Sequence, residues 1–192
     1  MLDHEEKLIR EAKKGVNESF GQLYDHYLPK IYRYVLLKVT QRQDAEDLTH
    51  EVFLSAWQKI DSYKSQGFPF SSWLYNIAHN RVIDHYRTKK NHADVDQVDE
   101  GFIKVVHALD KELDTAMQLE NVVKALRDLT DEQQDVVIMR FMEDLSHREI
   151  ARAINKSEGA VRLIQYRAIQ GLKEQLGGQP SEENKNNGGT IV

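Results

Sequence analysis

Apolar residues recur along most of this chain at the three- and four-residue spacing of amphipathic helices. No stretch alternates apolar and polar residues convincingly, so the pattern predicts an all-α fold without strands. The helical stripes cover about residues 3–14, 17–39, 44–60, 71–89, 115–128 and 131–143.

Residues 145–172 form the most distinctive part of the pattern. Ser146 and Glu149 have the spacing of a reciprocal capping box at the start of a short helix. Residues 155–157 interrupt the apolar stripe, and Ser157 is placed to cap a second helix. The inward positions of that helix are Val161, Ile164, Ala168 and Leu172. The pattern predicts a helix-turn-helix, whose second helix usually lies in the DNA major groove; the alternative is an ordinary helical hairpin inside a core.

Three other helix starts carry cap signals. Thr130 and Gln133 form a second capping box ahead of residues 131–143. Asn17 and Asp44 are expected to cap the helices that follow them.

The 192 residues allow one medium domain or two small ones, and the pattern favours two. The chain has no cysteine, which excludes disulfides, thiolate nucleophiles and Cys-ligated zinc. Its N-terminus is charged throughout, and no run approaches the ~18 apolar residues of a membrane span. We therefore expect a cytoplasmic protein without membrane insertion.

The net charge of −5 is concentrated in one segment, because residues 91–114 hold seven acidic and two basic side chains. Such a composition is typical of a solvated linker, although residues 102–109 are mostly apolar. The sequence thus divides into a first helical domain (1–90), an acidic linker (91–114), a helix-turn-helix domain (115–176) and a disordered tail (177–192).

The helix-turn-helix segment is basic, although the whole chain is acidic. Between residues 145 and 173, six Lys and Arg side chains face only Glu149 and Glu158. A local excess of positive charge favours DNA as the partner, since phosphate neutralisation supplies much of the affinity. Arg162 and Gln165 are of the types that read guanine and adenine edges. The alternative for each of them is a solvated surface residue.

Residues 68–90 combine a helical stripe with an unusual second face. Asn76, Asn80, Asp84 and Arg87 share that face, and basic side chains flank it. Aromatic rings are interleaved with these donors, at Trp73, Tyr75 and Tyr86. Rings beside amide and guanidinium donors suit unstacked bases of a single strand, whereas the alternative is a surface helix with core aromatics.

The sequence gives no support for a catalytic or a metal site. The chain has none of the common catalytic or phosphate-binding motifs. His79 and His85 are six residues apart and do not share a helix face, so they make a poor metal pair. We expect a non-enzyme without a metal or other cofactor.

The segments DAEDLTHEVFLSAWQKI (44–60) and FSSWLYNIAHNRVIDHYRTKK (70–90), followed by the helix-turn-helix, resemble bacterial RNA polymerase sigma factors of the extracytoplasmic-function class. The resemblance covers about residues 5–90 and 113–176. It implies two small helical domains, similar to sigma regions 2 and 4. It also implies a sigma factor that binds core RNA polymerase and directs promoter-specific initiation at a −35 duplex and a melted −10 element.

The resemblance carries site roles over to positions of this sequence. The polymerase-binding positions are Asp44, Glu46, Asp47, Glu51 and Trp57. The −10 positions lie in the loop 61–68 and the helix after it: Ser65, Phe68, Trp73, Asn76, Asn80, Arg81, Asp84 and Arg87. The −35 positions, to which Ser157 and Gln165 are added from the helix pattern, are His147, Arg148, Ser157, Gly159, Ala160, Arg162, Gln165, Tyr166 and Arg167.

The chain departs from the common family pattern at Leu163 and Ile164, which leaves more of the base reading to Arg162, Gln165 and Tyr166. The implied partners are core RNA polymerase and promoter DNA, both duplex and single-stranded. The resemblance also allows an anti-sigma factor, a monomer when free, and a linker whose residues 102–109 enter the RNA exit path. The alternatives are a stand-alone helix-turn-helix regulator with a ligand-sensing or dimerising first domain, and a protein-binding helical adaptor.

Overall fold

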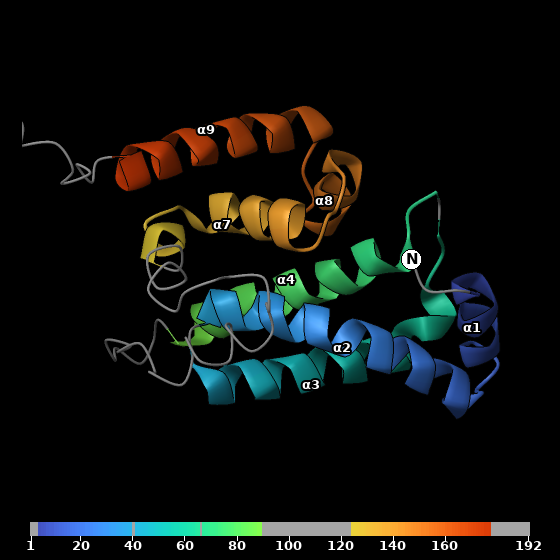
Figure 1. Cartoon of the computed structure of the whole chain (residues 1–192). Coiled ribbons are helices and arrows are strands. Elements are labelled where there is room, and N and C mark those ends of the chain that lie inside the picture. The colour runs from blue at the N-terminus through green and yellow to red at the C-terminus, as the bar shows by residue number, and fades with distance from the viewer. Residues whose placement is uncertain (1–3, 40, 66, 90–123, 178–192) are drawn as a thin grey trace, which may run out of the picture.

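The computed structural model describes residues 4–39, 41–65, 67–89 and 124–177, and all regular structure in them is helical (Figure 1). The elements are α1 (Glu5–Ala12), α2 (Asn17–Val39), α3 (Arg42–Lys59), η1 (Ile60–Ser62), α4 (Phe70–Lys89), α7 (Asp131–Val137), η2 (Ile138–Met142), α8 (His147–Ala153) and α9 (Glu158–Gly177). The all-α expectation is confirmed. The predicted linker, most of the predicted helix 115–128 and the predicted tail beyond Gly177 lie outside the described residues.

Helices α2, α3 and α4 pack side by side, and α1 lies against α2 at one end of this layer (Figure 1). Their inward stripes are those that the periodicity predicts. Leu23 and Ile31 of α2, Val52 of α3 and Leu74 of α4 are all buried. Burying such side chains removes apolar surface from water, and each large one stabilises the folded state by roughly 1.5–3 kcal/mol.

The second domain has a smaller core of its own. Leu126, Leu129 and Val137 pack with Ala168 of α9, and the partly buried Leu172 covers them. The five-residue η2 widens the helical turn after α7 to a π-helix.

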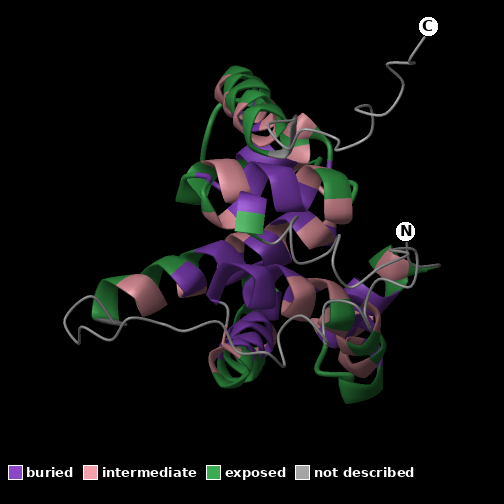
Figure 2. Cartoon of the chain, turned by 60° about the vertical axis from the view of Figure 1, so that its left-hand side comes forward, coloured by how far each residue is buried: buried purple, intermediate pink, exposed green. Residues whose placement is uncertain are grey.

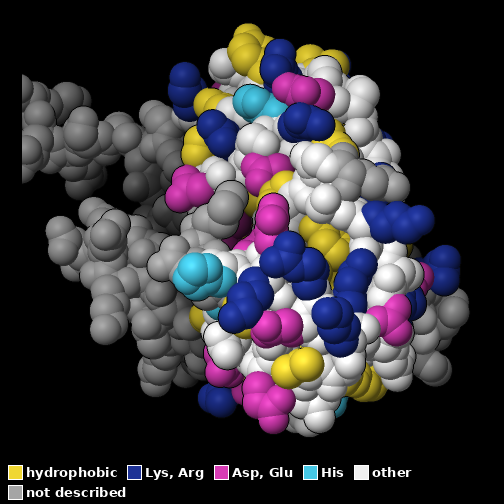
Figure 3. Space-filling view, turned by 90° about the vertical axis from the view of Figure 1, so that its right-hand side faces the viewer, with side chains coloured by type: hydrophobic (Ala, Val, Ile, Leu, Met, Phe, Trp, Pro, Cys, Tyr) yellow, Lys and Arg dark blue, Asp and Glu magenta, His cyan; other side chains and the backbone are white. Residues whose placement is uncertain are grey.

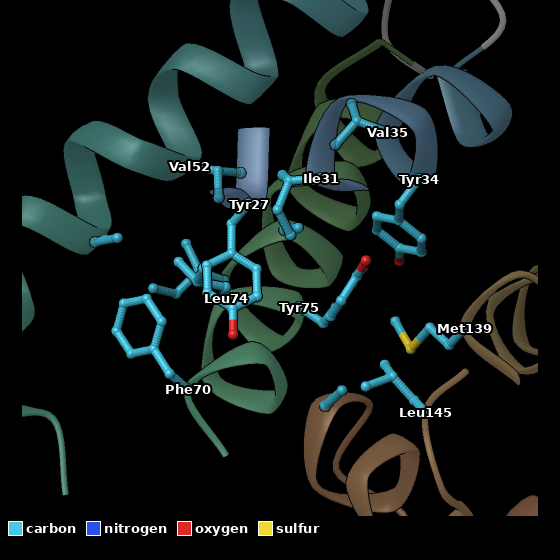
Figure 4. Close-up of a cluster of buried hydrophobic side chains, with 14 of the residues drawn as sticks. Tyr27, Ile31, Tyr34, Val35, Val52, Phe70, Leu74, Tyr75, Met139 and Leu145 are labelled. Carbon is cyan, nitrogen blue, oxygen red and sulfur yellow. The ribbon is translucent and has the colours of Figure 1, made fainter. Parts of the chain in front are cut away.

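The two domains also share one hydrophobic core, which the expectation of two tethered domains did not include. Buried positions run without a break from the first layer into α7, η2 and α8 (Figure 2). Met139 and Leu145 of the second domain point toward Tyr75 of α4 (Figure 4). The sequence interpretation placed Tyr75 among the rings for bases, and that placement is wrong, because Tyr75 is 1% exposed.

A buried polar cluster crosses the boundary between the domains. The carboxylate of Asp135 in α7 lies 3.1 Å from Lys38 Nζ of α2 and 3.1 Å from His79 Nδ1 of α4. The hydroxyl of Tyr34 donates to the same carboxylate over 2.9 Å. We call these four residues, Asp135, Lys38, His79 and Tyr34, the seam cluster. All four are less than 10% exposed.

Burial alone would raise the pKa of Asp135, but its contacts with His79 and Lys38 outweigh burial and leave that pKa below the ordinary value. A second charged contact lies nearby, where Arg33 Nε of α2 donates to Glu143 Oε1 over 2.8 Å. Arg33 also donates to the carbonyl of Met142. Burial raises the pKa of Glu143 despite its pairing with Arg33.

The helix starts test the cap predictions. The capping boxes of Ser146 with Glu149 and of Thr130 with Gln133 are both formed, as predicted. The cap prediction for Asp44 is wrong, since α3 begins two residues earlier, at Arg42, after an extended Gln41. Asn17 is itself the first residue of α2. Assignments of helix ends commonly differ by one or two residues, so a capping role of Asn17 stays a prediction.

Replacing Ser146 by Ala should lower the free energy of unfolding by about 1 kcal/mol, because the N–H of Glu149 loses its side-chain acceptor. Thermal or urea unfolding of the full chain measures the change. Ser146→Asp is the control and should stay near wild type, since Asp caps as well as Ser. Equal losses in both variants would contradict a capping role.

Asp135→Asn should cost about 3–5 kcal/mol at neutral pH, because it leaves Lys38 buried without its carboxylate partner. The folded-state pKa of Asp135 is lowered, so its contribution is complete above the ordinary value of 3.8 and is lost as the pH falls through the lowered value. The stability difference between wild type and Asp135→Asn should therefore shrink as the pH falls below about 4. Unfolding of both proteins over that pH range measures it; a constant difference would contradict the assignment.

Candidate nucleic-acid interface

The helix-turn-helix is built by local chemistry on both sides of its turn. Asn155 takes the left-handed conformation at φ 54°, which Asn tolerates better than most residues. The N–H of Lys156 then bonds back to the carbonyl of Ala151 over 2.9 Å, which closes the end of α8. Ser157 Oγ accepts from the N–H of Ala160 over 3.2 Å and caps α9, as predicted.

The outer face of α9 presents several of the predicted −35 side chains. Arg162, Tyr166 and Arg167 are exposed, and the ring of Tyr166 is 63% exposed. Arg162 Nη2 lies 2.5 Å from Glu158 Oε1 one turn earlier, in a solvent-exposed pair. Such exposed pairs are weak, so Arg162 can exchange this partner for a base edge. Gly159 is exposed and Ala160 half-buried at the start of the same helix.

His147 and Gln165 hold one another across the helix-turn-helix. His147 Nε2 and Gln165 Oε1 are 2.6 Å apart, and both side chains are half-buried. The sequence interpretation treated them as separate DNA contacts. Their pairing fixes the start of α8 against α9 and occupies the oxygen of the Gln165 amide.

Basic side chains of α8 gather over one ring of the first domain. The guanidinium of Arg148 lies 4.9 Å from the centroid of Phe68, and that of Arg152 lies 5.6 Å from it. Gly67 beside this ring has φ 79°, and a Cβ there would meet Arg148 Nη2 at 3.4 Å. Figure 3 shows Lys and Arg side chains collected on this side of the molecule. Arg152 was not among the predicted site residues, although its one-turn spacing from Arg148 could have indicated it.

The polar face of α4 holds the predicted amide and charged groups. Asn80 Nδ2 donates to Asn76 Oδ1 over 3.4 Å, and Arg87 lies 3.0 Å from Asp84. The amide of Asn76 donates in turn to the carbonyl of Ala153 at the end of α8, over 2.8 Å. This face is therefore continuous with the second domain and is not open along its whole length.

Rings at the start of α4 form a cluster beside the loop that contains Ser65 and Phe68. The ring of Trp73 lies 5.2 Å from Tyr63 and 5.4 Å from Phe70. Burial raises the pKa of Tyr63 to about 12, so its hydroxyl stays neutral. Trp73 remains half-buried and Ser65 is exposed.

The outer face of α3 carries the predicted acidic patch. Glu46, Asp47 and Glu51 are exposed, and Arg81 of α4 approaches Glu51 to 3.6 Å. Asp44 is half-buried and lies 3.5 Å from His85.

An apolar side chain accompanies these acids. Leu54 is 48% exposed, and it lies three residues after Glu51 and seven after Asp47, on the same helix face. Trp57 is not on this open face, since its half-buried ring packs on Phe20 at 4.8 Å. An exposed leucine beside acids is typical of a protein-binding surface, and the sequence interpretation missed Leu54.

No group of three His, Asp or Glu side chains that could hold a metal ion is found within the described ranges. In the same part of the chain, no helix is long and apolar enough to cross a membrane.

Two family models match separate parts of this chain. The family model for Sigma-70 region 2 matches residues 23–92, and the model for Sigma-70 region 4 matches residues 125–174. In this order the two models cover the layer of α2 to α4 and the helix-turn-helix domain. A stand-alone regulator would account only for the second match.

Curated relatives belong to one class. The ECF RNA polymerase sigma factor SigW of Bacillus subtilis is 30% identical over 179 residues, which span 88% of this chain and 95% of SigW. The ECF RNA polymerase sigma factor BldN of Streptomyces coelicolor is 35% identical over 173 residues, and the match spans 65% of BldN.

Solved structures show the same fold. CnrH in complex with the cytosolic domain of CnrY matches with a TM-score of 0.68 at 22% identity, over 88% of this chain and 95% of CnrH. The sigma factor RpoE of Bartonella quintana, solved with the anti-sigma factor NepR, matches with a TM-score of 0.70 at 21% identity, over 84% of this chain and 99% of RpoE. From its two region matches and its similarity to SigW over nearly the whole of both chains, this chain belongs to the ECF RNA polymerase sigma factors.

Proposed function

We propose that this chain binds core RNA polymerase and directs initiation at promoters by holding a −35 duplex and a melted −10 strand. The observation that carries the proposal is the presence of two different nucleic-acid faces in one chain. The outer face of α9 carries exposed groups suited to duplex edges, and α4 with its preceding loop carries rings and amides suited to unpaired bases. A duplex-binding regulator has no use for the second face.

The −35 role falls to α9 and the start of α8. Arg162 and Tyr166 are exposed on α9, and the exposed Arg148 of α8 and Arg167 of α9 supply positive charge. Phosphate contacts position the protein, whereas base contacts specify the sequence. We therefore assign base reading to Arg162 and backbone contact to Arg167. His147 positions Gln165 for the same groove.

The −10 role falls to Phe68, Trp73 and the amides of Asn76 and Asn80. Stacking on an aromatic ring is worth about 1–3 kcal/mol per base and does not require a paired strand. The amides lie one turn apart along α4 and offer donors and acceptors to base edges. Of the remaining predicted positions, Ser65 is in the loop, and Arg81, Asp84 and Arg87 follow along α4.

The polymerase role falls to the outer face of α3. Asp47, Glu51 and Leu54 lie together there, with the charge and apolar surface that a basic protein partner requires. We propose that the chain acts without catalysis, as a cytoplasmic monomer when free, and that it accepts an anti-sigma factor. That CnrH and RpoE were each solved with a second protein supports the last point.

Run-off transcription with purified core polymerase and a genomic promoter library tests the function. Wild-type chain should direct initiation from a defined subset of promoters. The double variant Asp47→Lys with Glu51→Lys should lose core affinity by several kcal/mol, because like charges then meet at the interface. Co-purification with core polymerase measures this loss.

A matched control carries the same change of charge elsewhere. Glu18→Lys with Asp25→Lys alters two exposed acids of α2 and should leave core binding near wild type. If the wild-type chain binds no core polymerase, the proposed function is wrong. If the α3 variant binds normally, the polymerase interface does not lie on this helix. Thermal melts of both variants should stay within about 0.5 kcal/mol of wild type, as is usual for surface changes.

Arg162→Ala should reduce discrimination at one position of the −35 element by about 1–3 kcal/mol, the worth of a good bidentate contact. Arg167→Ala is the matched control and should weaken binding about equally on all sequences, as a lost phosphate contact does. Binding of holoenzyme to the selected promoter and to single-base variants of its −35 element measures both. Uniform weakening by Arg162→Ala would remove this residue from base reading.

A further inference from the structure

Helix α9 packs on α7 and α8 with one side, and its other side faces away from the rest of the described chain (Figure 1). Val161 and Ala168 are 0% exposed and mark the packed side. Since an α-helix turns by about 100° per residue, four positions of its first four turns point within about 30° of the opposite direction. We call them the open face of α9: Gly159, Leu163, Tyr166 and Gln170, all of which are exposed.

Two large apolar side chains adjoin on the open face. Leu163 is 49% exposed and Tyr166 is 63% exposed, and their spacing of three residues makes them neighbours on the helix surface. Apolar surface that a folded chain leaves in water is typical of a binding site when polar groups border it. The predicted −35 positions do not include Leu163, whose side chain has no hydrogen-bonding group.

Arg162 and Arg167 border the open face on opposite sides, each about 70° from its centre. Both side chains are exposed. The DNA major groove has the same order across its width, with phosphates on both walls and base edges on the floor between them. A helix that enters the groove with the open face first places Leu163 toward the floor, and Arg162 is long enough to reach a base edge from the side. The flanking charges therefore favour duplex DNA over a protein as the partner of the apolar side chains.

Gly159 lets the start of the open face come close to the floor of the groove. It lies one turn before Leu163 in a helical backbone, and a Cβ at this position would meet nothing within 4 Å. Packing inside the chain therefore does not require glycine here. A glycine does allow a partner to approach the backbone closely. Leu163 is then the first side chain of the open face, counted from the start of α9, that meets the floor.

A leucine side chain can recognise a base through one group only. It neither donates nor accepts hydrogen bonds, and thymine alone of the four bases presents a methyl group in the major groove. Contact with that methyl group removes apolar surface of both partners from water, which the other three bases do not offer.

We infer that Leu163 is a specificity-determining residue that contacts the C5 methyl group of a thymine in the −35 duplex. The inference rests on the proposed function, because it names a base that α9 reads there. Arg162 and Leu163 then read the element in two different ways, the first through hydrogen bonds and the second through apolar contact.

Deoxyuridine in place of thymidine tests this contact, because it removes the methyl group and leaves every hydrogen-bonding group of the base in place. Each thymidine of the −35 element is replaced in turn, in a promoter that the run-off experiment selects. Binding of wild-type holoenzyme should weaken about fourfold at one of these positions, as expected for one buried methyl group. At the same position, DNA with 5-methyldeoxycytidine should bind about fourfold more tightly than DNA with deoxycytidine.

Variants of the open face assign the response to Leu163. Leu163→Ala should bind the thymidine and deoxyuridine promoters within about 1.5-fold of one another, because it no longer reaches the methyl group. Leu163→Met keeps an apolar side chain of similar size and should retain most of the response. Gln170→Ala is the matched control on the same face and should keep the fourfold ratio. Leu163 and Gln170 are both exposed, so thermal melts of these variants should stay near wild type.

Three results would overturn the inference: no thymidine position at which wild-type binding responds to loss of the methyl group, a response that persists in Leu163→Ala, or a −35 element without thymine on either strand. All three are distinct from failure of the proposed function. In that case the wild-type chain with core polymerase would start no transcription from any promoter.

Discussion

Burial of the Asp135 carboxylate sets how the two halves of this protein meet. A carboxylate that is 2% exposed costs several kcal/mol unless cations and donors surround it. Those groups, Lys38, His79 and Tyr34, come from two helices of the other domain. Helix α7 can therefore dock only where Asp135 reaches them. That one register also brings α8 over Asn76.

Helix α2 contacts both domains, because it is buried on two sides. Its stripe through Ile31 and Val35 packs within the first layer, and Tyr34 and Lys38 face the second domain (Figure 4). All six residues from Tyr34 to Val39 are buried. A helix buried on two sides couples the two domains, since loss of either neighbour exposes part of the same segment to water.

Local charge matters more than net charge for the proposed contacts. The whole chain is acidic, yet exposed acids lie on α3 and exposed bases lie on α8 and α9. At physiological salt, dissolved ions screen interactions between exposed charges beyond about 8 Å, so a phosphate or a polymerase side chain interacts mainly with the nearest groups. One chain can thereby present opposite potentials to two different partners.

Much of the local structure could be predicted from the sequence. Helical periodicity identified the inward stripes, and the boxes at Thr130 and Ser146 marked two helix starts, because a cap depends on residues only three positions apart. The motifs of the two regions also indicated the family. These features are encoded by neighbours along the chain, so one sequence is sufficient to find them.

The tertiary structure alone decided which outward faces become interfaces. Periodicity orients a side chain about its own helix but says nothing about the helix that covers it. Tyr75 and His79 lie off the predicted stripe of α4, and both are buried because the second domain packs there. Lys38 is a single charge within an apolar run, whereas Asp135 follows a polar stretch and precedes an apolar one. Their pairing depends on a contact between residues almost a hundred positions apart, which only the folded chain brings together.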